Sequence, residues 1–146
     1  MAFYIYSRSN VTPVVGNDLL TLISAANRRF CIHEVYLAGL GIQSQANDFS
    51  GARSTGGTTP SASLTPEKES TDTAAPAMTN ATAWAVQPAL AAGTPLKFAP
   101  NSNGGQIRWV AKTRTEMEFR NLEQFSLRPT LVGGANISFH VIVEEL

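Results

Sequence analysis

The sequence predicts an all-β protein, an antiparallel two-sheet β-sandwich with the topology of a jelly roll. Apolar residues recur mostly with a period of two, and turn-forming residues separate the segments that carry this pattern. Neither a long amphipathic helix nor a regular alternation of strands and helices is visible. The length of 146 residues fits a single domain covering positions 1–146.

The first half of the chain supplies three strand candidates. Phe3, Ile5 and Ser7 alternate with their neighbours in a first strand, and residues 10–17 form its turn-rich exit. Residues 18–26 fit either one helical face or a short strand, and we favour the strand.

The third candidate, residues 29–42, is long and rich in β-formers, which predicts a central strand. Gly39 and Gly41 indicate a bulge or close packing near its end.

The second half of the chain is again strand-rich. Residues 101–105 and 132–136 are its turn signals. Ile137, Phe139, Val141 and Val143 give the final strand one apolar face. The first and last strands of a jelly roll usually share a sheet, which suits a chain that begins and ends in strands. The remaining strand candidates are residues 83–87, 94–100, 106–111, 116–119 and 125–127.

Residues 43–82 interrupt the two strand-rich halves with a tract of Ser, Thr, Gly, Ala and Pro. Such a composition buries little apolar surface, so we expect a long surface loop that becomes ordered against a neighbouring subunit or a larger particle. Phe49, Leu64 and Met78 are the large apolar residues expected to anchor it. Arg53, Trp84 and Trp109 complete the residues expected at interfaces.

The charge pattern favours self-association over nucleic-acid binding. Eleven basic residues balance eleven acidic ones, and charged residues make up only 15% of the chain. The single cysteine, Cys31, lies in an apolar run and is expected to be a buried free thiol. We also expect a soluble, unprocessed protein, because no signal segment or membrane span is apparent.

Residues that could carry chemistry are sparse. His33 and His140 are the only histidines, so a three-histidine metal site is impossible. A site built from His33, Glu34, Asp48 and His140 is the remaining alternative. Adjacent strand residues point to opposite faces, however, so we expect His33 and Glu34 not to share an ion. Together with the absence of a Gly-x-Ser-x-Gly motif and of a phosphate loop, this predicts no catalytic residue, no metal, no cofactor and no small-molecule substrate.

Two further groups of residues allow two interpretations each. Arg28, Arg29 and the stretch 112–114 could contact phosphate, although solvated strand ends or salt links between subunits account better for them. Trp84 and Trp109 could form a platform for stacking sugars. Their apolar neighbours favour packing in a core or an interface.

Several segments together resemble the small jelly-roll head decoration, or cement, proteins of tailed bacteriophages. The resemblance covers most of the chain, and it is one of sequence style. The segments that carry it are the strand 30–42, the tracts 52–59, 64–68 and 73–77, the stretch 103–110, and the final strand ending in Glu144 and Glu145.

This resemblance implies a non-enzymatic virion protein that binds the major capsid protein, commonly as a homotrimer, and stabilises the assembled capsid. Its expected location is the capsid surface, after synthesis in the host cytoplasm, with neither nucleic acid nor membrane as a partner. The competing hypothesis is a carbohydrate-binding β-sandwich module of a phage fibre or surface protein.

Overall fold

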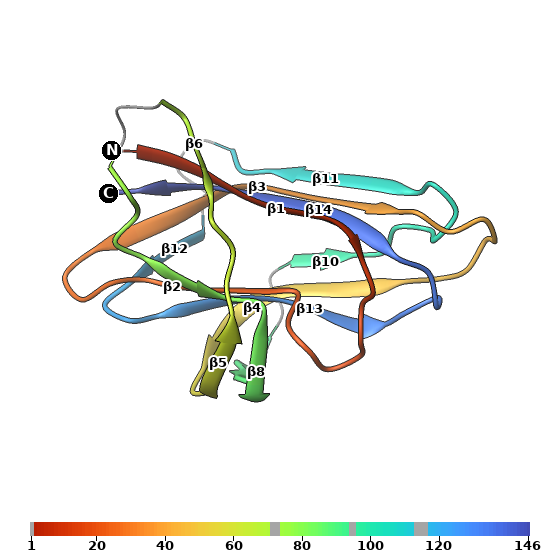
Figure 1. The fold of residues 1–146 in the computed structure, drawn as a ribbon, viewed down its shortest axis with the longest axis horizontal. Coiled ribbons are helices and arrows are strands. Elements are labelled where there is room, and N and C mark those ends of the chain that lie inside the picture. Colours follow the sequence, from red (N-terminus) through yellow and green to blue (C-terminus); the bar gives the residue numbers. More distant parts are fainter. Residues whose placement is uncertain (1, 71–73, 94–95, 113–116) are drawn as a thin grey trace.

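The computed structural model describes residues 2–70, 74–93, 96–112 and 117–146 and shows two antiparallel β-sheets packed face to face (Figure 1). Within these ranges the chain forms strands, turns and loops but no helix. The predicted all-β sandwich is therefore confirmed, and the strand order is compatible with a jelly roll.

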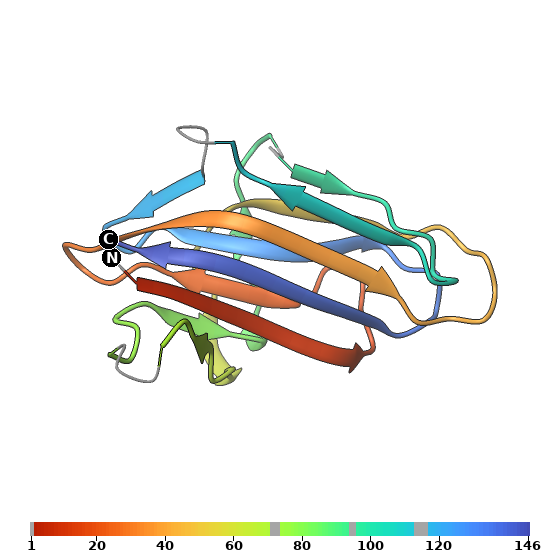
Figure 2. The ribbon, with the colours of Figure 1, turned by 90° about the horizontal axis from the view of Figure 1, so that it is seen from above.

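The first sheet contains both ends of the chain. Its strands run in the order β11-β3-β14-β1-β6, and β12 pairs with β3 beyond β11. Figure 2 shows the two termini side by side at one end of the molecule. The first and last strands thus lie in the same sheet, as expected, and they are direct neighbours. The strands are β1 Ala2–Val11, β3 Arg29–Gly39, β6 Glu67–Lys68, β11 Gln106–Val110, β12 Met117–Arg120 and β14 Ile137–Glu145.

The second sheet has the order β10-β4-β13-β2-β7, and β9 pairs with β4. A separate two-stranded sheet, β5 with β8, completes the fold. The strands of the second sheet are β2 Leu20–Ile23, β4 Asp48–Thr55, β7 Thr79–Ala81, β9 Ala89–Leu90, β10 Leu96–Phe98 and β13 Gln124–Leu131, and the small sheet consists of β5 Thr58–Ala62 and β8 Ala83–Val86.

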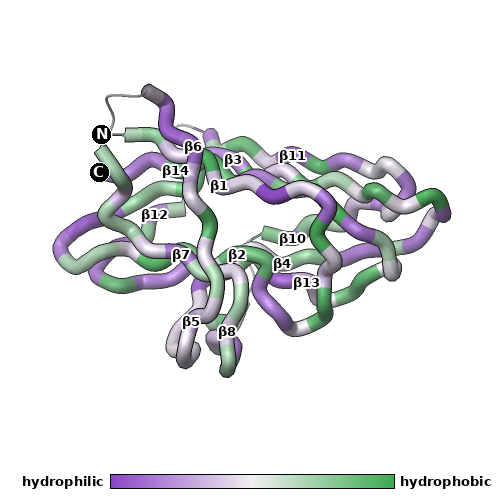
Figure 3. Tube along the Cα trace, in the orientation of Figure 1, coloured by the Kyte–Doolittle hydropathy of each residue, from purple (hydrophilic) through white to green (hydrophobic). Residues whose placement is uncertain are grey.

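The core fills the space between the two main sheets. Alternation along the strands places one side chain in two there, and Figure 3 shows the resulting mixture of hydrophobic and hydrophilic positions along the chain. Phe30 stacks on Phe119 with ring centres 4.9 Å apart, and Phe119 meets Phe125 edge to face. These three rings join β3 and β12 of the first sheet to β13 of the second.

Several expectations for single elements are confirmed. Residues 18–26 contain the strand β2, and β3 is the interior strand predicted for 29–42, although it ends at Gly39 and residues 40–42 belong to the following loop. Gly39 is closely packed, since an added Cβ would lie 2.3 Å from the carbonyl oxygen of Asn101. The bulge lies elsewhere in β3, because the pairing with β14 shifts register between Glu34 and Ile32. Of the predicted strands, positions 94, 95 and 116 lie outside the described residues.

The expected loop over residues 43–82 needs correction at its start. Residues 48–55 form β4, an interior strand of the second sheet, bonded to β13 on one side and to β10 and β9 on the other. Gly51 is closely packed in this strand, because an added Cβ there would lie 3.3 Å from the ring of Phe125. The lack of large apolar residues in positions 50–52 is therefore compatible with a closely packed strand and does not indicate a loop. The rest of the tract contains the short strands β5, β6 and β7.

Candidate binding surface

The two ends of the sandwich carry different loops. At one end of the sandwich the strands β1, β3 and β13 finish and the strands β4 and β14 begin. The loops attached to these strand ends therefore lie together at that end of the molecule (Figure 1). We call this the uncharged end, because its loops contain one formally charged side chain, the buried Asp18. The loops are residues 12–19, 40–47, 99–105 and 132–136.

Exposed aliphatic side chains concentrate at the uncharged end. Among the described residues, eight large apolar side chains are exposed, and five of them lie in these loops or at the last residue of β13. Ile42 is the extreme case, with 92% of its surface exposed. Figure 3 shows the tip of the loop after β3 coloured as hydrophobic. The five residues are Val14, Val15, Leu40, Ile42 and Leu131.

Buried polar side chains hold these loops together. Ser102 is 1% exposed, and its Oγ lies within 3.1 Å of the carbonyl oxygens of Gln43 and Gln45. Asn47 donates from Nδ2 to the carbonyl oxygen of Pro100, and its Oδ1 accepts the N–H of Gly133 at 2.7 Å. Three loops are therefore joined by hydrogen bonds.

Glycines allow the same loops to approach closely. The N–H of Gly41 donates to the carbonyl oxygen of Ser102 at 2.6 Å, and an added Cβ on Gly41 would lie 2.6 Å from the Cβ of Ala135. A pocket of about 510 Å³ opens beside Leu40 and Ile42. The exposed aliphatic residues are thus presented on an ordered support.

The only acid of the uncharged end is neutralised inside the protein. The Asp18 side chain is fully buried, and Arg128 donates from Nε to its Oδ1 at 2.5 Å. The hydroxyls of Thr21 and Ser126 each donate to Asp18 Oδ2 at 2.6 Å. Satisfying a buried carboxylate in this way avoids the large cost of an unpaired charge.

This polar cluster also positions β8 against the outer face of the second sheet. Trp84 donates from Nε1 to the Thr21 hydroxyl at 3.0 Å, and Arg128 donates to the carbonyl oxygen of Pro88 at 2.6 Å. The side chain of Gln87 accepts the backbone N–H of Asp18. Asp18 and Arg128 were not identified in the sequence, where nothing in their local pattern marks them as a pair 110 positions apart.

The opposite end carries charge and is called here the charged end, defined by residues 24–29 and 118–123 together with Arg53. Glu118 lies 2.7 Å from Arg120 and 3.8 Å from Arg29. Arg53 pairs with Glu123 at 2.9 Å, and its guanidinium lies 4.5 Å from the ring centre of Phe119. For Arg28, Arg29 and residues 112–114 the sequence predicts solvated strand ends or salt links between subunits. Arg29 lies at an exposed strand end and pairs within its own chain, and positions 113 and 114 lie outside the described residues.

The six residues expected at interfaces have different fates. Phe49 and Met78 are 0% and 4% exposed, respectively, and belong to the core, so their assignment as interface anchors is wrong for this fold. Leu64 packs against the same core, and Asn80 bonds both its N–H and its carbonyl oxygen. Phe49, Leu64 and Met78 thus attach residues 43–82 to the core of their own chain. Arg53 is exposed at the charged end.

The two tryptophans contribute to packing, as the favoured interpretation predicts. Trp109 is partly buried against the core. An added Cβ on Gly57 would lie 2.9 Å from the ring of Trp84, so this indole packs on the Gly57 backbone as well as bonding to Thr21. The structure does not bring the two rings together in one surface platform, because they lie on different sheets.

Both histidines lie on the outer face of the first sheet. His33 Nε2 is 2.7 Å from Glu144 Oε2, and His140 Nε2 is 2.7 Å from Glu34 Oε1. Arg108 donates to the second oxygen of Glu34 at 2.6 Å. These contacts lower the pKa of Glu34, with the hydrogen bond from Arg108 as the largest cause, while burial opposes them.

The expectation that His33 and Glu34 point to opposite faces is wrong. Their partners, His140 and Glu144, lie four positions apart on β14 and so share one face. The register shift in β3 makes His33 an extra residue, which lets both side chains reach that face. Asp48 lies on the other sheet and bonds Lys97 and Thr130. Across the described residues, no group of three or more His, Cys, Asp and Glu side chains is placed to hold a metal.

The residues of the uncharged end were missed in the sequence, although one signal was present. Runs of Gly, Asn, Ser and Gln without any Lys, Arg or Glu occur in all the loops that meet there. Only the topology shows that these separate runs form one surface.

Comparisons with known proteins give no relative for this chain: no family model, no curated protein and no solved structure matches it. The described part of the chain also contains no helix that is long and apolar enough to cross a bilayer.

Proposed function

We propose that this protein is a structural component of a phage virion that binds and stabilises an assembled capsid through its uncharged end. The observation that carries the proposal is the concentration of exposed aliphatic residues on ordered loops that lack unpaired charge. Exposed apolar patches mark sites of protein contact, and the centres of protein interfaces are depleted of charged residues. The resemblance of the sequence to decoration proteins supplies the identity of the partner.

The order of these loops favours binding to a large, fixed lattice. Association costs free energy for every side chain and loop that must be immobilised. Ser102 and Asn47 already hold the loops in the free protein, so little ordering remains to be done on contact. Each bound copy would then add its contact to the cohesion of the shell.

The homotrimer belongs to the same proposal. A chain with zero formal net charge and few charged residues has little electrostatic repulsion between its copies. Several linked copies on one shell raise the strength of attachment through effective concentration, without requiring any single contact to be strong.

The carbohydrate-binding alternative depends on an exposed aromatic platform. The N–H of Trp84 is bonded to Thr21, and Trp109 packs on the core. This alternative therefore has less support than capsid binding.

The test is co-sedimentation of the purified protein with heads assembled from the major capsid protein encoded in the same genome. Val14→Ser changes the uncharged end, and Val110→Ser changes a strand outside it. Both valines are 52% exposed, so the two variants are matched in chemistry and accessibility. Ile42→Ser is the stronger version of the first change.

The proposal predicts that Val14→Ser and Ile42→Ser weaken binding to heads several-fold, whereas Val110→Ser leaves it unchanged. Equal binding by all three variants, or no binding by the wild-type protein, would contradict it.

A further inference from the structure

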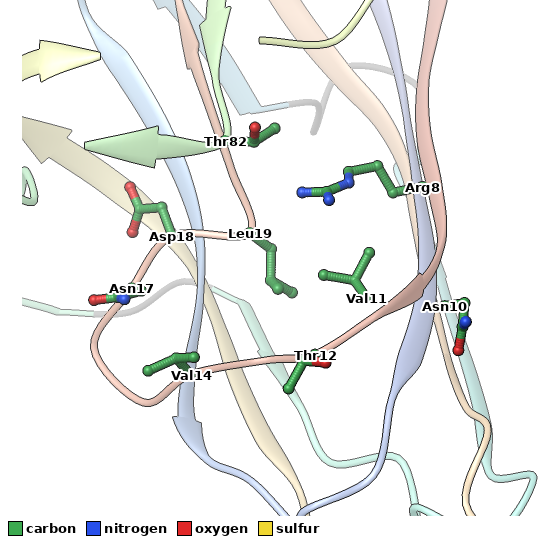
Figure 4. Close-up of a pocket in the computed structure, with 9 residues that line it drawn as sticks. All are labelled: Arg8, Asn10, Val11, Thr12, Val14, Asn17, Asp18, Leu19 and Thr82. Carbon is green, nitrogen blue, oxygen red and sulfur yellow. The ribbon is translucent and has the colours of Figure 1, made fainter. Parts of the chain in front are cut away.

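A pocket of about 420 Å³ lies on the open side of the sandwich, between β1 and the loop that precedes β2. Figure 4 shows Val11 and Leu19 on its floor and the side chain of Arg8 reaching into it from β1. Val11 and Leu19 belong to the hydrophobic core, so the pocket exposes the margin of that core. Asn17 and Thr82 add polar groups to its rim.

Arg8 occupies an unusual position for a cation. It follows Tyr4 and Tyr6 with the same alternation, and both tyrosines are buried between the sheets. The Arg8 side chain therefore leaves β1 on the inward face and reaches into the pocket, where it remains exposed to solvent (Figure 4). Among the described residues, none forms an ion pair or a hydrogen bond with its side chain. Asp18, which also lines the pocket, is already paired with Arg128.

The edge of β1 beside the pocket is open. β6 pairs with this edge only at Tyr4 and Ile5, and the N–H of Glu69 donates to the carbonyl oxygen of Phe3. In an antiparallel pair every second residue bonds to the same neighbour, so Ser7 follows Phe3 and Ile5 and presents its N–H and C=O groups to the unoccupied edge, just before the register shift of β1 between Arg8 and Val11. An unpaired strand edge is a template for an added strand.

We propose that this edge and pocket together bind an extended, acidic segment of a partner protein. The segment would pair with β1 at Ser7 as an added strand, in line with β6. One of its carboxylates would enter the pocket and pair with Arg8, and apolar neighbours on the same face would cover Val11 and Leu19. Charge complementarity selects the ligand, because Arg8 is the one uncompensated charge among the residues that line the pocket.

The competing explanation is that Arg8 only protects the edge. An inward-pointing charge on an edge strand discourages pairing with other chains. In that case Arg8 would repel strand addition, and its removal would promote binding. The two explanations thus predict opposite effects of Arg8→Gln.

The test uses a short, acetylated and amidated peptide of alternating serine and valine with a central glutamate, and a second peptide with glutamine in its place. Binding is followed by amide chemical shifts of the labelled protein. We expect the glutamate peptide to shift residues 7–11 and to bind about five-fold more tightly than the glutamine peptide, since charge-assisted hydrogen bonds are the stronger kind. Arg8→Gln should abolish this preference.

Three controls keep the test specific. Arg28→Gln removes an exposed arginine at the charged end and should leave the preference intact. Arg8→Lys should retain part of it, and thermal melting checks that each variant is folded. A glutamate peptide with N-methylated serines should not bind, because the serines are the residues whose N–H groups would face β1.

The proposal is overturned if neither peptide binds at millimolar concentration, if both bind equally, or if Arg28→Gln acts as strongly as Arg8→Gln. Equal binding of the N-methylated peptide would overturn the added strand. The peptide experiment does not measure binding to capsids. Its result therefore tests the peptide site alone, and the head-binding experiment tests the proposed function alone.

Discussion

The two ends of this sandwich treat charge in opposite ways. At the uncharged end the single acid, Asp18, is fully buried and paired, and aliphatic side chains face the solvent. At the charged end Arg53, Glu118 and Glu123 form ion pairs on the surface. Surface pairs stay solvated and are costly to dehydrate in an interface, whereas exposed aliphatic groups gain from burial. The comparison therefore supports the proposal that the uncharged end, and not the charged end, forms the contact with a partner.

The largest expected effect concerns these two treatments of charge. Arg128→Met should leave the buried Asp18 without its partner and lower the free energy of unfolding by about 3–5 kcal/mol. Arg53→Met removes a pair whose two side chains are about half exposed, and it should cost about 1 kcal/mol. Urea denaturation of both variants measures the difference, and similar losses would remove the distinction between the two pairs.

A second prediction tests how the uncharged end is held in place. Gly39→Ala puts a Cβ where the backbone of residues 101–102 already lies, so it should destabilise the protein by about 3 kcal/mol. It should also weaken binding to heads, because the loops 40–47 and 99–105 must separate.

Gly104→Ala is the control for this change, because an added Cβ at Gly104 meets no atom within 4 Å. Its positive φ of 65° limits the expected cost to about 1 kcal/mol. Equal stability and equal head binding of the two variants would show that close packing of Gly39 does not hold the loops.

At the charged end one residue is strained without being buried. Asn121 and Leu122 both have positive φ, and the N–H of Glu123 donates to the carbonyl oxygen of Arg120, which defines a tight hairpin turn. Leu122 is 62% exposed, so Leu122→Gly should relieve the backbone and raise stability by about 1 kcal/mol. Thermal melting measures this gain. Unchanged binding to heads is expected, and a loss of binding would assign a contact to this end instead.

The smallest expected effect lies on the outer face of the first sheet, between the two ends. The pKa of Glu34 is lowered from its ordinary value of 4.5, chiefly by Arg108. A lowered pKa means that the contribution to stability is present above pH 4.5 and is lost as the pH falls below that value. Arg108→Gln should make this acid loss shallower, and the change should be small because the Arg108 side chain is largely exposed. Stability measured between pH 3 and 7 tests this, and identical profiles for both proteins would refute it.

The strand pattern of this chain could be read from the sequence wherever large residues alternate, as in β1, β3 and β14. It could not be read in β4, because Gly51 lacks a side chain for a reason that lies in another strand: the ring of Phe125 occupies the space above it. A strand selected for close packing and a flexible loop have similar local compositions.

The candidate site was less predictable than the fold. Phe49 and Met78 were identified as apolar exceptions within a polar tract, but large size alone does not distinguish a core position from an interface. The position of His33 depends on a register shift that no local pattern marks. The sequence alone does not show that Ile42 belongs to a surface shared by several loops, because only the fold places its loop beside residues 132–136.

The central claim is that the uncharged end faces the partner. A cryo-electron microscopy map of heads bound by this protein would test it most directly, because the two ends of the sandwich differ in shape and in their loops. The loop that carries Leu40 and Ile42 should contact the shell, and the turn at Leu122 should point to solvent. A map in which the end bearing Arg29 and Arg120 rests on the shell would contradict the account.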